Sequence, residues 1–218
     1  MNESSPNSQA PTLLLFLKAP RAGDVKTRLA ADIGPEEALA VYRRLAEAQV
    51  RRLPGDWPLE IHYAPPDARA EMERWLGYGR TFFPQAHGDL GARLAVAVQG
   101  AFATGARSVI CLGADCPALD AARLREADRA LVDGADIVFG PADDGGYYLV
   151  GMNRAETAVF TRIPWSTEKT LAASLAAAER NGLKIKLLEP LSDVDTADDL
   201  ARAAAEGYLT DLTPHTHP

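Results

Sequence analysis

The chain has 218 residues, of which 47% are hydrophobic and 24% are charged. This composition is typical of a soluble globular protein, and the length is sufficient for one large α/β domain. The formal net charge of -7 argues against sequence-independent binding of nucleic acid, which requires a broad basic face. An anionic ligand would therefore have to bind at a local cluster of basic residues.

The only two cysteines of the chain are Cys111 and Cys116. Two thiols cannot build a disulfide framework, and we expect no secretory leader, so the prediction is a cytoplasmic protein with reduced thiols. The longest apolar runs are far too short to cross a bilayer as a helix. We therefore expect no membrane span.

The first structural element follows a tail, residues 1–11, that is rich in Ser, Asn, Gln and Pro and is predicted to be disordered. Residues 12–17 are almost wholly apolar and are bounded by proline, which predicts a central strand. The loop that comes next, residues 18–29, contains four cations within eleven residues. Its cations and turn-forming residues are Lys18, Pro20, Arg21, Gly23, Lys26 and Arg28.

This basic loop is physically suited to bind a diphosphate. Lysine and arginine supply positive charge, and the N–H groups of the loop and the following helix supply hydrogen-bond donors. The loop matches neither G-x-x-x-x-G-K-[ST] nor G-x-G-x-x-G, so the common P-loop and dinucleotide-binding patterns are absent. Taken alone, a basic loop can equally be a solvated surface.

The next elements alternate between helix and strand. Apolar periodicity predicts helices over residues 35–53, 67–76 and 89–104, and strands over residues 59–64 and 81–85. Asp89 is the predicted N-cap of the third helix. Arg93 then falls on the first turns of that helix, where it is either a surface arginine or a nucleotide-binding residue.

The most chemically informative stretch begins with residues 108–113, which predict a strand buried on both faces of a parallel sheet. Asp115 follows the carboxyl end of that strand. In an open α/β sheet, ligands bind at this edge because loops and helix N-termini surround a crevice there. Asp115 can alternatively be only the cap of the next helix.

A turn with two carboxylates connects two further predicted strands, residues 136–140 and 147–151. The turn contains Asp143, Asp144, Gly145 and Gly146. Paired glycines permit a tight turn and close approach of the backbone to a ligand, so this turn is a candidate ligand floor. Asp-Gly is also the commonest hairpin signal, which leaves a purely structural interpretation open.

The remaining elements are an Ala-rich helix predicted to start within residues 164–168, a last strand at 184–188 and a final helix. Trp165, beside the start of the Ala-rich helix, either stacks on a sugar ring or belongs to the core. Residues 211–218 are predicted to be disordered.

Two more aspartates, Asp193 and Asp195, follow the last strand. They alternate along an extended segment, so both side chains lie on the same side. They are a second source of carboxylates that could meet Asp115.

Four motifs together resemble a known superfamily. In chain order they are K-A-P-R-A-G-D-V-K-T-R-L, G-A-D-C-P, G-P-A-D-D-G-G-Y and D-V-D-T-A-D-D-L. They resemble the GT-A-like nucleotide-diphospho-sugar transferase superfamily, in particular a bacterial group of formerly uncharacterised glycosyltransferase-like proteins, some of which are assigned to arsenosugar biosynthesis. The resemblance covers residues 12–208, and the set of motifs is far more specific than any one of them.

The resemblance implies a fold and a cofactor. The fold would be a three-layer α/β/α Rossmann-like GT-A fold with a mostly parallel mixed central sheet, in a single domain over residues 12–210. The cofactor would be Mg²⁺ or Mn²⁺. Asp115 and Asp195 would bind this metal, with Asp193 open as an alternative to Asp195.

The resemblance also implies roles for the other residues. The nucleotide- and phosphate-binding residues would be Lys18, Pro20, Gly23, Lys26, Arg28 and Arg93. The substrate-binding residues would be Asp143, Gly145, Gly146, Tyr147 and Trp165. If the reaction inverts the configuration of the sugar, Asp144 is the candidate catalytic base for the acceptor hydroxyl.

The leading hypothesis is a metal-dependent glycosyltransferase that moves a sugar from a nucleotide-diphosphate donor to a small-molecule acceptor. Two departures keep an alternative open, because the loop lacks G-x-G-x-R and the metal motif is D-x-P rather than D-x-D. The alternative is a nucleotidyltransferase that joins an NTP to a phosphorylated acceptor and releases pyrophosphate, since similar motifs occur in guanylyltransferases acting on phospholactate and the molybdenum cofactor. A third class is a nucleotide sensor that binds without turnover.

Overall fold

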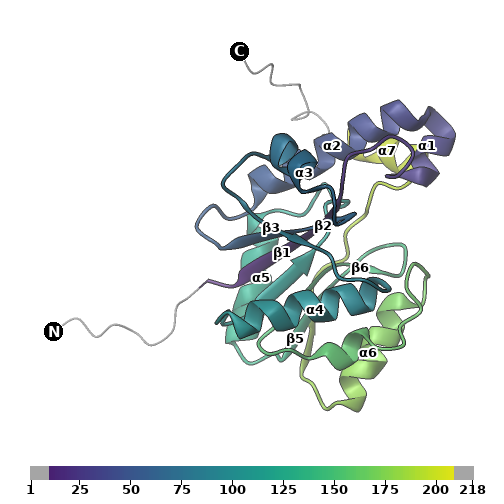
Figure 1. The fold of residues 1–218 in the computed structure, drawn as a ribbon. Helices are drawn as coiled ribbons and strands as arrows, with labels where there is room; N and C mark the ends of the chain where they lie inside the picture. Colours follow the sequence, from purple (N-terminus) through teal and green to yellow (C-terminus); the bar gives the residue numbers. More distant parts are fainter. Residues whose placement is uncertain (1–9, 209–218) are drawn as a thin grey trace.

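The central sheet extends to both sides of β1 (Thr12–Lys18) in the computed structural model, which describes residues 10–208 (Figure 1). The other strands are β2 (Leu59–Ala64), β3 (Thr81–Pro84), β4 (Val109–Leu112), β5 (Ile137–Pro141), β6 (Tyr147–Met152) and β7 (Ile185–Leu187). The helices are α1 (Thr27–Ile33), α2 (Pro35–Arg52), α3 (Arg69–Leu76), α4 (Leu90–Ala103), α5 (Ala121–Val132), the 3-10 helix η1 (Thr157–Phe160), α6 (Thr170–Arg180) and α7 (Ala197–Ala205).

The strands pair in the order β3-β2-β1-β4-β6-β5-β7. All neighbours run parallel except β6, which is antiparallel to both β4 and β5. The predicted mostly parallel mixed sheet is therefore confirmed. Because β6 alone is reversed, its first residues lie at the same edge of the sheet as the carboxyl ends of the other strands.

The side chains of β1 explain the three layers. Leu13, Leu15 and Leu17 pack in one core cluster with residues of α2, α3 and α5. Leu14 and Phe16 face the opposite side and pack with residues of α4 and α6. A strand covered on both faces reads as a continuous apolar run, which is the pattern that the sequence showed here. The predicted α/β/α arrangement is confirmed.

Side-chain caps set the start of two helices. Asp89 accepts a hydrogen bond from the N–H of Ala92 at 2.8 Å, which confirms the predicted cap of α4. Thr196 and Asp199 form the capping box that starts α7. Both caps satisfy N–H groups that have no partner within the helix.

The Ala-rich helix starts later than predicted. Its first residue is Thr170 rather than a residue within 164–168. The hydroxyl of Thr170 donates to the carbonyl of Pro164 at 2.9 Å, which holds the intervening residues in a turn. As a result, Trp165 and Ser166 lie in an irregular segment before the helix, at the edge of the sheet described below.

The predicted tails, residues 1–11 and 211–218, lie outside the described residues, apart from residues 10 and 11. Cys111 and Cys116 are both buried free thiols, which agrees with the expectation of reduced cysteines. Among the helices of residues 10–208, none has the length and apolar character needed to cross a membrane.

Tyr42 of α2 holds the start of the basic loop in place through two hydrogen bonds. The hydroxyl of Tyr42 accepts a hydrogen bond from the N–H of Lys18 at 2.9 Å and donates one to the carbonyl of Lys18 at 2.8 Å. Burial raises the pKa of Tyr42 far above its ordinary value, so the hydroxyl keeps its proton. The last residue of β1, where the basic loop begins, is thereby fixed in position.

We expect Tyr42→Phe to lower the free energy of unfolding by about 1–2 kcal/mol, because it removes both hydrogen bonds between the buried Tyr42 hydroxyl and the backbone of Lys18. Urea denaturation measures this change. Tyr78→Phe is the matched control, since Tyr78 is 75% exposed and its substitution should change stability by less than about 0.5 kcal/mol. Equal losses in the two variants would contradict this account.

Candidate active site

Two cavities meet where β1, β4 and β5 end. The larger, here called the basic cavity, has a volume of about 490 Å³ and is lined by four cations, Lys18, Lys26, Arg28 and Arg93. The smaller, here called the acidic cavity, has a volume of about 280 Å³ and is lined by four carboxylates, Asp115, Asp144, Asp193 and Asp195. The residues that line both cavities are Leu90, Asp115, Ser166 and Asp195.

The cations and the carboxylates meet at Lys26. Its Nζ lies 2.6 Å from Oδ1 of Asp115 and 3.0 Å from Oδ1 of Asp195. The Lys26 side chain is only 4% exposed, whereas that of Asp115 is 49% exposed. Arg28 reaches the second oxygen of Asp195 at 3.6 Å from a more exposed position. The predicted convergence of the basic loop with both candidate metal aspartates is therefore present.

Backbone contacts place these residues. Asp115 follows β4, and its carbonyl accepts a hydrogen bond from the N–H of Val194 at 3.0 Å. Val194 is 1% exposed, so it anchors the segment in the core. Asp193 and Asp195, on either side of this anchor, both line the acidic cavity. This shared cavity agrees with the expectation that their side chains lie on one side.

Burial and neighbouring charges shift the pKa values of two residues of the site, Lys26 and Asp193. Burial by itself would lower the pKa of Lys26, but the carboxylates of Asp115 and Asp195 outweigh it and the pKa is raised, so Lys26 stays charged. Burial raises the pKa of Asp193 to about 6, and repulsion from Asp195 and Asp144 adds to this effect. The acidic cavity thus carries more negative charge than one ammonium balances.

The Asp-Gly-Gly turn forms another wall of the acidic cavity. Oδ1 of Asp144 accepts a hydrogen bond from the N–H of Gly146 at 2.8 Å, which orients the carboxylate. Gly145 has a φ of +86°, and a Cβ there would lie 2.3 Å from the carbonyl oxygen of Glu168. Only glycine fits at this position, because both the backbone angle and the space exclude a side chain. The turn therefore packs against the start of α6.

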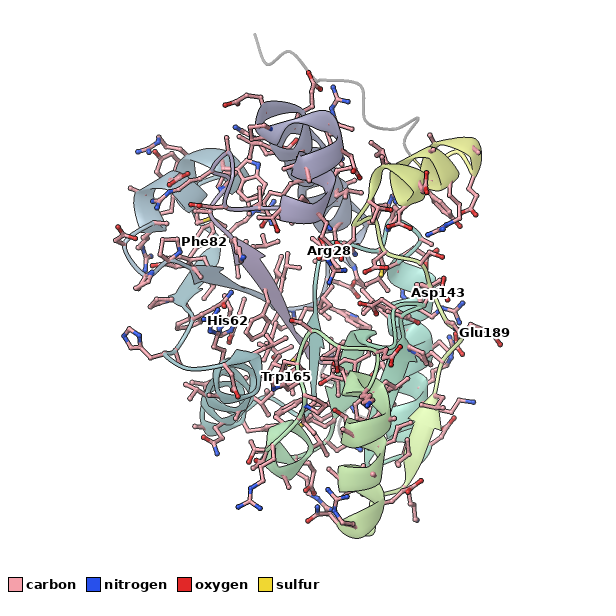
Figure 2. All side chains as sticks on the ribbon, turned by 90° about the vertical axis from the view of Figure 1, so that its right-hand side faces the viewer. Arg28, His62, Phe82, Asp143, Trp165 and Glu189 are labelled. Atoms are coloured by element: carbon pink, nitrogen blue, oxygen red, sulfur yellow. The ribbon has the colours of Figure 1, made fainter. Side chains whose placement is uncertain are left out.

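Four of the predicted ligand residues line neither cavity. They are Pro20, Gly23, Asp143 and Gly145. Asp143 instead accepts a hydrogen bond from the hydroxyl of Ser192, and in Figure 2 it lies to the right of both Arg28 and Trp165. Pro20 and Gly23 shape the basic loop, which Lys18 closes by donating to the carbonyl of Asp24 at 3.3 Å.

Arg93 lines the basic cavity together with a residue that the sequence did not indicate. The Arg93 guanidinium donates to the carbonyl of Gly88 at 3.0 Å and to Oε1 of Gln85 at 3.3 Å. Nε2 of Gln85 donates in turn to the carbonyls of Leu17 and His62. The amide of Gln85 is thus locked between β1 and β2, a role that no local sequence pattern announces.

Trp165 lies in an aromatic group and also lines the acidic cavity. Its ring packs edge-on against Tyr147 with centroids 6.1 Å apart, and it tilts against Phe160 at 6.5 Å. A Cβ at Gly91 would lie 2.8 Å from Nε1 of Trp165, so α4 and the indole are in close contact. Both earlier interpretations, core packing and contact with a ligand, are compatible with this position. Tyr147 lines the same cavity and is partly buried.

Ser166 lines both cavities, although the sequence did not indicate it as a ligand residue. Its φ is +60°, in the left-handed region that residues other than glycine rarely adopt. Such strained positions cluster at functional sites. The sequence carries no signal for it, because the strain comes from the turn that Thr170 holds.

Comparison with known proteins identifies a family and several solved structures of similar fold. A family model described as "Uncharacterized protein conserved in bacteria (DUF2064)" matches residues 47–167. A crystal structure from Desulfovibrio desulfuricans G20, provisionally named a nucleotide-diphospho-sugar transferase, is 33% identical with a TM-score of 0.81, over 88% of this chain and 85% of that chain. A search of curated protein sequences finds no match.

Two more distant structures share the fold. A nucleotidyl transferase from Methanothermobacter is 17% identical with a TM-score of 0.60, over 91% of this chain and 98% of that chain. Rv0371C of Mycobacterium tuberculosis in complex with manganese is 18% identical with a TM-score of 0.53, over 88% and 97% of the two chains. At these identities the likeness concerns the fold alone.

We expect Asp193→Asn to stabilise the protein at pH 8 in the absence of divalent cations. The folded pKa of about 6 lies above the ordinary 3.8, so the folded state holds this proton more tightly, and stability falls as the pH rises between these two values. Because the side chain is partly exposed, the expected gain is on the order of 1 kcal/mol.

Urea denaturation at pH 8 and at about pH 4 measures this effect, which should be small at the lower pH because Asp193 is then protonated in the folded state. The control is Asp133→Asn, at an exposed position. A gain of equal size at both pH values would contradict the assignment.

Proposed function

Because the chain belongs to the bacterial family described as "Uncharacterized protein conserved in bacteria (DUF2064)", with the resemblance to nucleotide-diphospho-sugar transferases confirmed, we propose that it is a metal-dependent glycosyltransferase. Its donor would be a nucleotide-diphosphate sugar and its acceptor a small molecule. The observation that carries the proposal is the meeting of the basic loop with Asp115 and Asp195 at one ammonium.

The carboxylates are an appropriate donor set for a divalent cation. Within residues 10–208, no three His, Cys, Asp or Glu side chains are arranged to hold a metal by themselves. Mg²⁺, however, is usually bound by one or two carboxylates together with substrate phosphates. Asp115 and Asp195, at the boundary of the two cavities, would hold Mg²⁺ or Mn²⁺ in this way. When bound, the cation would supply Lewis acidity beside the leaving diphosphate.

The basic cavity would bind the nucleotide diphosphate. Lys18 ends β1, Lys26 and Arg28 lie at the start of α1, and Arg93 lies on α4. Positive groups fixed before the reaction stabilise the charge that develops on a leaving diphosphate. Arg93 is oriented by Gln85 and Gly88, so its guanidinium needs little reorganisation when the ligand binds.

The acidic cavity would bind the sugar and the acceptor. Trp165 and Tyr147 offer apolar ring surface there, and Asp144 offers a carboxylate whose Oδ1 is held by the N–H of Gly146. The other oxygen of Asp144 would accept the proton of the attacking hydroxyl. In this arrangement the acceptor and the leaving group lie on opposite sides of the boundary formed by Asp115 and Ser166.

Nucleotidyl transfer is the second candidate function. The D-x-P sequence at Asp115, in place of D-x-D, and the fold shared with a named nucleotidyl transferase support it. In that reaction a phosphate of the acceptor would attack the α-phosphate of an NTP. Asp144 would then not be needed as a base, because the attacking phosphate is already ionised.

Product analysis separates the two reactions. We expect the protein with Mn²⁺ and a panel of sugar nucleotides to release nucleoside diphosphate when small hydroxylated acceptors are present. Pyrophosphate release from NTPs with phosphorylated acceptors would favour nucleotidyl transfer instead. Binding of nucleotides without either product across the panels would support a sensor and contradict both enzymatic proposals.

We expect Asp144→Asn to lower kcat for sugar transfer by about 10²–10⁴-fold with a smaller change in KM, because a general base acts in the transition state. Steady-state kinetics with the donor identified by product analysis measures this. Asp133→Asn, at the exposed C-terminal end of α5, is the control and should retain the kcat of the unchanged protein. Near-normal kcat in Asp144→Asn would remove Asp144 from the role of base.

A further inference from the structure

Lys26 occupies the place between the two candidate metal ligands. Its Nζ contacts the same oxygen, Oδ1, on Asp115 and on Asp195, at 2.6 and 3.0 Å. These contacts join the basic loop to segments that follow β4 and β7. A divalent cation and this ammonium would therefore compete for the same carboxylate oxygens.

The surroundings reinforce this competition. Asp144 and Asp193 line the acidic cavity beside Asp115 and Asp195. These four carboxylates share one cavity, where like charges repel one another, and Lys26 contacts two of them. Without Lys26 between them, Asp115 and Asp195 would have to be held together against their own repulsion.

The position of Lys26 in the chain allows its ammonium to move. Lys26 lies at the N-cap of α1 with φ 48° and ψ 47°, and Gly23 precedes it in the loop with a φ of +84°. Lys26 also lines the basic cavity, where the diphosphate is proposed to bind. Since a lysine side chain is a flexible four-carbon chain, its ammonium can turn from the carboxylates toward that cavity while the backbone stays in place.

We infer that Lys26 is a resident counter-ion of the metal site, which holds Asp115 and Asp195 together in the ligand-free protein and yields its place to a divalent cation only when a diphosphate takes over the ammonium. This inference rests on the proposed function. It makes Lys26 the positioning residue that couples metal binding to diphosphate binding. By thermodynamic linkage, each ligand then increases the affinity for the other by the same factor.

Binding of Mn²⁺ alone tests the inference without any turnover. Isothermal titration calorimetry, or the free Mn²⁺ signal in electron paramagnetic resonance, gives the affinity in the absence of nucleotide. We expect weak binding by the unchanged protein and about tenfold or greater tightening in Lys26→Met, since couplings of this kind commonly span 5- to 150-fold. Lys26→Gln, which keeps a hydrogen-bond donor for the two carboxylates, should tighten binding in the same direction.

Arg28→Met is the charge-matched control. It removes one positive charge near Asp195 but leaves Lys26 between the carboxylates, because Arg28 contacts Oδ2 of Asp195, at 3.6 Å, whereas Lys26 contacts Oδ1. Its Mn²⁺ affinity should change by less than about threefold, as expected of an exposed ion pair. Equal tightening in Arg28→Met and Lys26→Met, or no tightening in either Lys26 variant, would overturn the inference.

Crystals of the unchanged protein give a second test that does not depend on the folding of a variant. With Mn²⁺ alone, anomalous density between Asp115 and Asp195 should be absent. With Mn²⁺ and inorganic pyrophosphate, density should appear there, with Nζ of Lys26 moved onto the pyrophosphate. Mn²⁺ between the aspartates with Lys26 still in contact with both, or no Mn²⁺ there under either condition, would overturn the inference.

A failure of the inference about Lys26 can be distinguished from a failure of the proposed function. The absence of sugar transfer across the donor panel would reject the glycosyltransferase, whereas the Mn²⁺ affinities of the Lys26 and Arg28 variants would still decide the role of the ammonium. Conversely, an active transferase whose Lys26 variants bind Mn²⁺ no more tightly would retain its function and lose this coupling.

Discussion

The contact of the Lys26 ammonium with Asp115 and Asp195 joins three parts of the chain that the sequence separates widely. The Lys26 side chain is almost fully buried, so the charge of its ammonium is stabilised by these carboxylates rather than by water. A buried charge is tolerated only when it is paired in this way. The rest of the site depends on this pairing, because it holds the basic loop in contact with Asp115 and Asp195.

The directions of the strands explain why one edge of the sheet carries both the cations and the carboxylates of the site. The parallel strands β1, β4 and β5 deliver their carboxyl ends to that edge, and the reversed strand β6 starts there. The Asp-Gly-Gly turn between β5 and β6 therefore lies beside the residues that follow β4. Ligands bind at such edges in open α/β sheets because loops there surround a crevice. The reversed strand β6 thus brings the Asp-Gly-Gly turn to the same edge as the carboxyl ends of the parallel strands, where it lines the acidic cavity.

The two cavities differ in charge, because lysine and arginine line only one of them, whereas Asp115 and Asp195 line both. Cations from the β1 loop and α4 line one, and carboxylates from three different segments line the other. Asp115 and Ser166 stand at the boundary, and the strained backbone of Ser166 is held by the hydrogen bonds of Thr170 that also delay the start of α6. A diphosphate on one side and a neutral, hydroxyl-bearing acceptor on the other would match this division.

The sequence by itself determined the strands, the capped start of α4 and the chemical types of the site residues, because these depend on local periodicity and local hydrogen bonds. The motif order also indicated the superfamily correctly. Only the tertiary structure decided that Lys26 lies between Asp115 and Asp195, that Asp143 pairs with Ser192 outside both cavities, and that Gln85 orients Arg93. These contacts join residues brought together by the packing of the sheet and its loops, and the spacing of residues along a chain does not encode distances of that kind.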